Sequence, residues 1–534
     1  MKFNSVRNPY PTTRVPQYAQ RGMVATSHPL AAQAGLSILQ AGGNAVDAAI
    51  ATAACLTVVE PTSNGIGGDA FAIVWMKDEM FGLNSSGPAP AAISIEAVRN
   101  AGHETMPKAG WTPVTVPGAP AAWAALSKRF GALSLTQCLA PAINYAKYGH
   151  PVAPVVASGW RGAARAYSSR EGAEFAPWRD VFAPGGNAPA AGEIWKSPHH
   201  ADTLKEIAET EAKSFYSGRL ADEIAAFSTK TGGYLSKSDL ENYQPRWVTP
   251  ISAKYRGYEV WELPPNGQGL VALIALNVLS AYDFPVKECP AAYHKAFEAM
   301  KLAFTAGKEF ITDPDHMKTD ITALLSPKYA EKLRALIGET ALDPAPISPH
   351  SGGTVYLSTA DGDGNMVSYI QSNYQGFGSG IVVPGTGIAL QNRGADFSLN
   401  PSHANALAPG KRTYHTIIPG FLTKNGKAVG PFGVMGGYMQ PQGHVQVIMN
   451  TLDFGLNPQA ALDAPRWQWT SGRQFEIERT FPHHIAEELA AKGHQICLPL
   501  NSGGFGRGQI IWRGENGVLC GGTEARCDGA IAAY

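Results

Sequence analysis

Charged residues are scarce in this chain of 534 residues, at 16% of positions, and the two signs balance at 43 each. The formal net charge is therefore zero. Neither a basic stripe nor an interleaved aromatic run stands out, which argues against a nucleic acid partner. The same balance gives no electrostatic reason to expect binding to a membrane. With 44% hydrophobic residues, the composition is that of a large folded body rather than of a disordered protein.

Long apolar runs and a secretion signal are also missing. The N-terminus lacks the apolar core of a signal peptide. The longest apolar stretch, AVDAAIATAACLTVV, is too short and too rich in alanine to span a bilayer. We therefore expect a cytoplasmic protein. Its six cysteines have no CxxC spacing and are expected to be free, mostly buried thiols, with a Cys520–Cys527 disulfide as the less favoured alternative.

Common catalytic and metal-binding motifs are absent from the sequence. There is no HExxH, no zinc-type Cys/His spacing, no Walker loop and no calcium loop, so we expect neither a metal nor an organic cofactor. The segment GFGSG at 376–380 has its serine in the fourth place, whereas a nucleophile elbow needs it in the third. The pairs His199-His200 and His483-His484 are interpreted as surface histidines, because no further ligands lie at useful spacing.

The sequence does contain a long helical part followed by a part rich in strands. Apolar residues at helical spacing predict four helical regions, at 27–40, 45–60, 121–230 and 292–310. The segment TVYLSTADGDGNMVSYIQS predicts a β-hairpin. The runs GIVVP, GIALQN, HTIIPGFL and GPFGVMGG are strand-like, and a late helix is expected from QPQGHVQVIMNTLDF. The irregular segment at about 317–349 is a predicted exposed linker. Strands from both parts can share sheets in a layered α/β body.

The residues Ser351-Gly352-Gly353-Thr354 lead directly into the predicted hairpin. A threonine hydroxyl inside a chain has no adjacent base. If the preceding peptide bond is cut, the new α-amine, with a pKa near ~8, can accept the hydroxyl proton. Glycines before the threonine allow the backbone strain that attack on the preceding carbonyl requires. On this pattern alone, a threonine that merely opens a strand remains an alternative.

Eight segments resemble the motifs of one known family and follow in that family's order. They are GGNAVDAAIATAACLTVVEPTSNGIGGDAFAIVW, TPVTVPGAPAAWAAL, YRGYEVWELPPNGQG, TVYLSTADGDGNMVS, LQNRGADFS, PGKRTYHTIIP, VMGG and ALDAPRW. Each segment alone could be a turn or a core strand, but the ordered set covers nearly the whole chain. The chain thus resembles the gamma-glutamyltransferases of the N-terminal-nucleophile hydrolase superfamily.

This resemblance implies an α/β fold, a four-layer αββα sandwich formed by one precursor. Autocleavage between Gly353 and Thr354 would give a large subunit, 1–353, and a small subunit, 354–534, which together form one body. Whether these pairs associate further into a dimer is left open. Thr354 would then be the nucleophile that attacks an amide carbonyl.

The resemblance also implies roles for other residues. The backbone amides of Gly436 and Gly437 would form the oxyanion hole. Ser372 takes the place of a family threonine that hydrogen-bonds the nucleophile. Asp396 matches the acid that holds the α-amine of the substrate.

Several positions depart from the glutathione-processing members of that family. Ser86 stands where an arginine binds the glutamyl carboxylate, so a strong charge-assisted contact is missing. His415 and Thr416 replace paired serines, Tyr374 replaces an asparagine, and Arg393 replaces a glutamine. Larger side chains and a new cation indicate a small acid substrate whose carboxylate binds Arg393.

These features resemble the subgroup that includes oxamate amidohydrolase, an enzyme of purine catabolism. We therefore predict hydrolysis of oxamate to oxalate and ammonia through an acyl-enzyme on Thr354. One alternative is a gamma-glutamyl hydrolase or transferase acting on glutathione or gamma-glutamyl amides. An alternative of another class is an uncleaved, inactive homologue that acts as a binding or scaffold protein.

Overall fold

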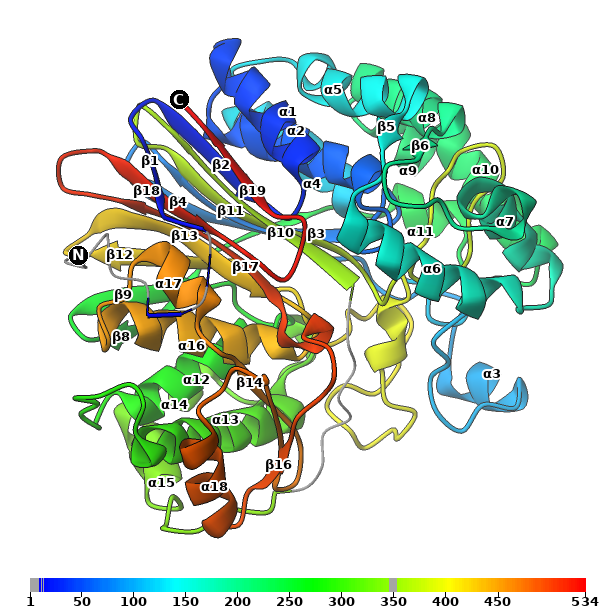
Figure 1. Ribbon diagram of the computed structural model, residues 1–534. Helices are drawn as coiled ribbons and strands as arrows, with labels where there is room; N and C mark the ends of the chain where they lie inside the picture. Colours follow the sequence, from blue (N-terminus) through cyan, green and yellow to red (C-terminus); the bar gives the residue numbers. More distant parts are fainter. Residues whose placement is uncertain (1–8, 11, 13, 345–352) are drawn as a thin grey trace.

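Two seven-stranded β-sheets lie face to face at the centre of the protein, and helices cover both outer faces (Figure 1). The computed structural model describes residues 9, 10, 12, 14–344 and 353–534. In spatial order the first sheet contains β19 (Ala530–Ala533), β2 (Gly22–Thr26), β10 (Gly353–Asp361), β11 (Met366–Tyr374), β3 (Asp69–Met76), β4 (Glu79–Ser85) and β7 (Arg246–Val248). The second contains β1 (Gln17–Ala19), β18 (Leu519–Thr523), β17 (Arg507–Arg513), β13 (Lys427–Met435), β12 (Gly420–Lys424), β9 (Tyr258–Glu262) and β8 (Ile251–Tyr255).

The helices form the two outer layers and a lobe beside the first sheet (Figure 1). The first sheet is covered by α1 (Pro29–Gln40), α2 (Ala45–Val59) and α4 (Ala119–Phe130), and the second by α12 (Gly269–Leu279), α16 (Met439–Leu452) and α17 (Pro458–Asp463). Other helices are α3 (Ile95–Asn100), α5 (Leu135–Tyr148), α6 (Pro154–Ser168), α7 (Ala176–Phe182), α8 (Pro198–Glu209), α9 (Lys213–Ser217), α10 (Arg219–Lys230), α11 (Lys237–Glu241), α13 (Pro290–Phe310), α14 (Ile321–Leu324), α15 (Pro327–Arg334) and α18 (His483–Ala491). The predicted four-layer αββα sandwich is therefore confirmed.

Two smaller sheets lie outside this sandwich. One pairs β5 (His150–Pro151) with β6 (Ile194–Trp195), and the other contains β14 (Trp467–Ser471), β15 (Gln474–Ile477) and β16 (Gln495–Cys497).

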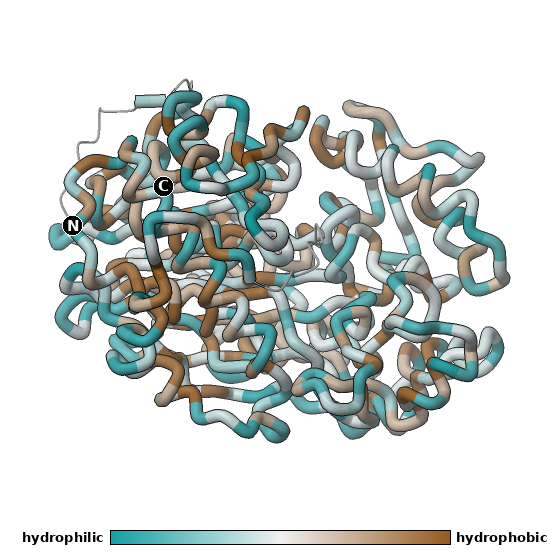
Figure 2. The backbone as a smooth tube through the Cα atoms, turned by 90° about the horizontal axis from the view of Figure 1, so that it is seen from below, coloured by the Kyte–Doolittle hydropathy of each residue, from teal (hydrophilic) through white to brown (hydrophobic). Residues whose placement is uncertain are grey.

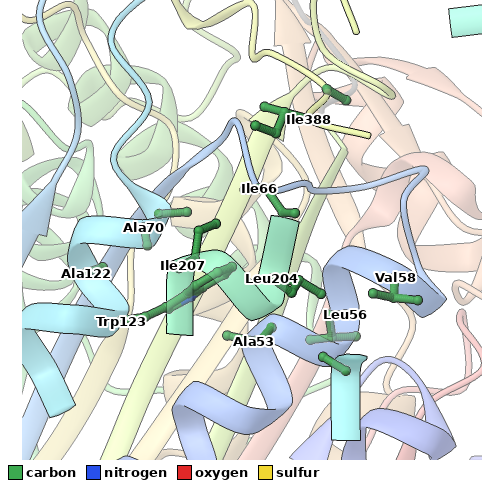
Figure 3. Packing of buried hydrophobic residues seen from close by; sticks show 14 of the residues in the cluster. Ala53, Leu56, Val58, Ile66, Ala70, Ala122, Trp123, Leu204, Ile207 and Ile388 are labelled. Carbon is green, nitrogen blue, oxygen red and sulfur yellow. The ribbon is translucent and has the colours of Figure 1, made fainter. Parts of the chain in front are cut away.

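Helix α2 shows how the sequence builds the outer layer on the first sheet. Asn44 caps the helix by accepting from the amides of Val46 and Asp47, and Asp47 returns a bond to the Asn44 amide. Every residue of α2 is buried. Its many alanines let neighbouring elements approach closely, and its larger side chains pack against strands and other helices (Figure 3). The prediction of a wholly buried helix here is confirmed.

A separate apolar layer fills the space between the two sheets. It includes Phe71, Ile73, Tyr356, Ile370 and Phe421. Figure 2 shows many of the apolar stretches running through the middle of the body. No helix in the described ranges is both long and apolar enough to cross a membrane.

The structure corrects three of the predicted segments. GIVVP and GIALQN form no named strands and share only a bridge between Val382 and Ala389. The glycines at 380, 385 and 387 have positive φ angles, which interrupt extended backbone. The predicted linker at 317–349 contains α14 and α15 in its described part, while residues 345–349 lie outside the described residues.

The histidine and cysteine predictions have mixed outcomes. His199, His483 and His484 are exposed, but His200 is buried and its Nδ1 lies 3.0 Å from the hydroxyl of Ser197. The interpretation of His200 as a surface residue was therefore wrong, because its helix turns it inward.

All six cysteines are free and four of them are buried, which confirms the thiol prediction.

Both sheets draw strands from each side of the predicted cleavage site. In the first sheet, β10 and β11 lie between β2 and β3, which come from the N-terminal part. In the second, β12 pairs with β9 of the N-terminal part. Because each sheet contains strands from both parts, separating the two fragments would break inter-strand hydrogen bonds and open the apolar layer between the sheets.

We therefore predict that the fragments stay together after cleavage. A denaturing gel should show two bands of about 37 and about 19 kDa, in proportion to their lengths. Native mass spectrometry should show one particle that contains both fragments. Free fragments under native conditions would contradict this arrangement.

Candidate active site

Thr354 lies at the start of β10, and its buried hydroxyl contacts a second hydroxyl, that of Ser372 on β11. The two oxygens are 2.9 Å apart. Ser372 Oγ also donates to the carbonyl oxygen of Gly353 at 2.8 Å and accepts from the amide of Tyr374 at 2.8 Å. Because Ser372 has one proton and gives it to Gly353, Thr354 is the donor in the pair. One side chain thus contacts both the hydroxyl of Thr354 and the carbonyl before it.

The sheet is irregular at this point. Gly353 lies opposite Tyr374, whereas Val355 lies opposite Gln371, so the register shifts across Thr354. Tyr374 has a φ of 75°, a left-handed conformation that costs a non-glycine residue about 1–3 kcal/mol. Such bulges re-aim side chains beside active sites. Here Tyr374 joins two groups, since its amide donates to Ser372 and its hydroxyl donates to Asp396.

Gly353 is required by close packing. A Cβ on it would lie 2.9 Å from the amide nitrogen of Gly376 and 3.1 Å from the Cα of Ser63. Its φ lies outside the left-handed region, so the structure explains this glycine by close approach rather than by backbone strain. Ser351 and Gly352 of the same motif lie outside the described residues.

Arg393 and Asp396 form a buried ion pair beside Tyr374, with 3.0 Å between Arg393 Nη1 and Asp396 Oδ2. The guanidinium stacks on the ring of Tyr374 at 3.7 Å. Asp396 Oδ1 accepts from the hydroxyls of Tyr374 at 2.8 Å and Tyr438 at 3.0 Å. Arg393 Nη2 donates to Thr416 Oγ1 at 2.9 Å. Arg393, Asp396, Tyr374 and Thr416, all indicated by the sequence, therefore form one connected group. Tyr438 also belongs to this group, although the sequence did not indicate it.

Gly436 and Gly437 form the turn between β13 and α16. Their φ angles of 143° and 62° favour glycine at both positions. Gln268 links this turn to Thr416. Its side-chain amide nitrogen donates to the carbonyls of Gly437 at 2.8 Å and Thr416 at 2.7 Å. The following helix adds positive potential at its N-terminus. Such a turn can present amide donors to a developing oxyanion, and Gln268 is a further residue that the sequence reading missed.

His415 pairs with Asp69 rather than with Arg393 or Asp396. Its Nε2 lies 3.0 Å from Asp69 Oδ2, while its Nδ1 accepts from the amide of Ile417. Burial and the nearby Arg393 lower the pKa of His415 well below its usual value, so the ring is neutral. Burial raises the pKa of Asp69 to about 7 despite several hydrogen bonds. Asp69 lies opposite Ser372 in the sheet, so this pair borders the nucleophile.

Ser86 occupies the position at which the glutathione-processing members are expected to have an arginine. It is buried in a polar cluster. Its hydroxyl donates to Asn84 at 2.7 Å, and its carbonyl accepts from Arg412 Nε at 2.9 Å.

One group in the described ranges, His294, Glu298 and His494, brings three potential metal ligands together. Hydrogen bonds occupy both nitrogens of His294, while Nδ1 of His494 has no partner among the described residues. His294 Nε2 lies 3.0 Å from the Gly338 carbonyl, to which it must donate, so its Nδ1 accepts from His494 at 2.8 Å. The ammonium of Lys301 lies 2.7 Å from Glu298 and opposes a divalent cation there.

A buried ion pair lies next to the turn of Gly436 and Gly437. Arg466 donates to the carbonyl of Gly506, which packs against Gly436, and pairs with Glu524 at 2.6 Å. Burial alone would raise the pKa of Glu524, but Arg466 and Arg526 lower it from 4.5 to about 2. The ionised carboxylate therefore stabilises the folded state.

We predict that this stabilisation is lost in acid. Folding lowers the pKa of Glu524, so its ionised carboxylate contributes about 3 kcal/mol to the free energy of unfolding. This contribution is complete above pH 4.5 and disappears as the pH falls toward 2. Glu524→Gln should lower the melting temperature at pH 7 and remove this part of the acid sensitivity. If the wild type and Glu524→Gln lose equal folding free energy between pH 5 and pH 3, Glu524 is not the source of this acid sensitivity.

A second prediction concerns Ser372. Ser372→Ala removes the donor to the Gly353 carbonyl and the acceptor of the Thr354 proton, so self-cleavage should slow about a hundredfold. Densitometry of denaturing gels over time measures this rate. Ser368→Ala changes a serine on the same strand that contacts Tyr356, and serves as a matched control that should cleave normally. Normal cleavage of Ser372→Ala would exclude the proposed contact.

Comparison with known proteins gives a consistent result. The family model described as gamma-glutamyltranspeptidase matches residues 31–534. The glutathione hydrolase-like YwrD proenzyme of Bacillus subtilis is 38% identical over 95% of this chain and 97% of its own length. The oxamate amidohydrolase proenzyme of Klebsiella pneumoniae is 34% identical over 96% of this chain and 98% of its own.

Solved structures agree. A cephalosporin acylase from Bacillus halodurans superposes with a TM-score of 0.96, is 61% identical, and covers 100% of this chain and 99% of its own. The family and these relatives are N-terminal-nucleophile hydrolases that act on amide or other C–N bonds, and the curated relatives are named as proenzymes. This chain belongs to the gamma-glutamyltranspeptidase family and is an autoprocessed hydrolase of that kind.

Proposed function

We propose that the processed protein hydrolyses amides whose acyl group carries a carboxylate but no α-ammonium group. The observation that carries this proposal is the state of Asp396. Its two oxygens already accept hydrogen bonds from Arg393, Tyr374 and Tyr438. In the glutathione-processing members the matching acid holds the substrate amine. Here Asp396 orients Arg393 instead and has little capacity left for an ammonium group.

Arg393 is the group that would bind the substrate carboxylate. It is buried, and its Nε has no hydrogen-bond partner among the described residues. Leaving a charged donor unpaired in a buried site is costly, and an incoming carboxylate would relieve that cost. A carboxylate can use the edge formed by Nε and Nη2, so binding would be directional as well as electrostatic.

Cleavage at Gly353–Thr354 would supply the missing base. The free α-amine of Thr354 takes the proton of the hydroxyl, and the oxygen attacks the amide carbonyl. The amides of Gly436 and Gly437 stabilise the oxyanion. The C–N bond then breaks, and the amine leaves with the proton from the α-amine. Water, deprotonated by the same amine, hydrolyses the ester on Thr354 and releases the acid.

Oxamate is the substrate that we propose first, with oxalate and ammonia as products and purine breakdown as the setting. Arg393 is a buried cation that could hold the carboxylate of a small acid, and a relative of 34% identity is named oxamate amidohydrolase. A second candidate is deacylation of a cephalosporin side-chain amide. It is favoured by the 61% identity to a protein named cephalosporin acylase. Both candidates belong to the same reaction class.

The test is ammonia release from oxamate, measured with a coupled assay, beside turnover of gamma-glutamyl-p-nitroanilide and of a carboxyacyl cephalosporin. We expect oxamate to be hydrolysed and the gamma-glutamyl substrate to be poor. Arg393→Met should lower kcat/KM for oxamate about a hundredfold or more, since it removes a charge-assisted contact.

The exposed Arg99 provides a matched control, and Arg99→Met should leave oxamate turnover unchanged. Turnover of gamma-glutamyl-p-nitroanilide alone would exclude the proposed class. Turnover of the cephalosporin amide alone would retain the class and replace the substrate. A protein that remains one uncut chain without activity would support the scaffold alternative.

A further inference from the structure

Lys308, on α13, reaches the group formed by Arg393, Asp396 and Tyr438. Its ammonium donates to the hydroxyl of Tyr438, which in turn donates to Asp396 Oδ1 at 3.0 Å. The ammonium also lies over the rings of Tyr438 and Tyr414, at 3.9 and 4.5 Å from their centres. Lys308 is therefore tied to the acid through one phenol, whereas Arg393 contacts the acid directly.

The charges around Asp396 do not cancel. Arg393 and Lys308 are two cations near the carboxylate of Asp396, and the nearby His415 is neutral. The second carboxylate near Arg393 is that of Asp69, whose pKa of about 7 leaves it only partly ionised at neutral pH. Among the described residues no carboxylate is close enough to form an ion pair with Lys308, and Tyr438 is its single hydrogen-bond partner. An ammonium group has three N–H donors, so two of them have no hydrogen-bond acceptor among the described residues. An excess of positive charge with available donors is suited to an anion and repels a cation.

We propose that Lys308 is a specificity-determining residue that attracts the acyl carboxylate of the substrate and repels an α-ammonium group at the same position. This inference rests on the proposed function and extends it by naming the second cation. Asp396 alone would attract an ammonium group. With Arg393 paired to it and Lys308 joined to it through Tyr438, the local field has the opposite sign.

The charge of Lys308 depends on pH in a useful range. Burial and the repulsion of Arg393 lower the pKa of Lys308 to about 8, although the attraction of Asp396 raises it. Other groups that face it are the phenols of Tyr414 and Tyr438 and the imidazole of His403, whose pKa is lowered by burial and by Lys308. Since the ammonium is present below pH 8 and lost above it, anion binding should weaken as pH rises through 8.

Glutarate and L-glutamate provide a matched pair of probes, because they differ only in the α-ammonium group. Calorimetric titration of the processed enzyme at pH 7 measures both affinities without any turnover. We expect glutarate to bind at least about tenfold more tightly than L-glutamate. Lys308→Met should lower this preference about tenfold or more, and Lys308→Arg should keep it. Lys295→Met, a change elsewhere on α13, should have no effect.

The pH profile separates a charge effect from a packing effect. Glutarate affinity of the wild type should fall as pH rises through 8, and Lys308→Met should lack this fall. An unchanged preference in Lys308→Met, or an unchanged pH profile, would overturn the role of Lys308. Failure of oxamate turnover would refute the proposed substrate without affecting these affinities, so the two proposals can fail separately. Equal binding of both acids by the wild type would overturn the inference.

Discussion

The hydroxyl of Ser372 contacts two groups that must react if the chain is to mature, the Thr354 hydroxyl and the Gly353 carbonyl. A nucleophile is weak inside a chain, so its attack depends on such alignment. The bulge at Thr354 and the close packing around Gly353 hold these groups in place. The proposed amide hydrolysis depends on this contact, because its base is the amine that scission at this bond would create.

The fold permits that scission without loss of the structure. Each sheet contains strands from before and after the bond, and the apolar layer between the sheets contains residues from both parts. The same interleaving brings the pocket together from distant parts of the sequence. Lys308 and Gln268 precede the bond, while Arg393, Asp396 and Tyr438 follow it. We therefore expect neither fragment to have a complete site by itself.

Part of this arrangement could be predicted from the sequence. The buried α2 and the hairpin of β10 and β11 follow from periodicity and turn residues, and the motif order indicated the family. Arg393, Asp396, Tyr374 and Thr416 were chosen one by one, and the structure brings all four into contact. Their mutual pairing could not be foreseen, because motif positions do not tell which polar groups satisfy each other.

Other features depend on tertiary packing. Lys308 is on a helix whose spacing predicts only an amphipathic face, and its contact with Tyr438 joins positions 130 residues apart. The glycine-rich segment after β11 has apolar runs typical of strands, yet positive φ angles at its glycines prevent a sheet. His200 appeared polar and exposed in sequence, but the fold buries it against Ser197.

The most direct test of the central claim is mass analysis of active enzyme quenched with acid during turnover of its amide substrate. The account predicts a chain whose first residue is Thr354, with a fraction of it carrying the acyl group of the substrate on that residue. Full activity in material whose Gly353–Thr354 bond is intact, or an acyl group found on another residue, would contradict it.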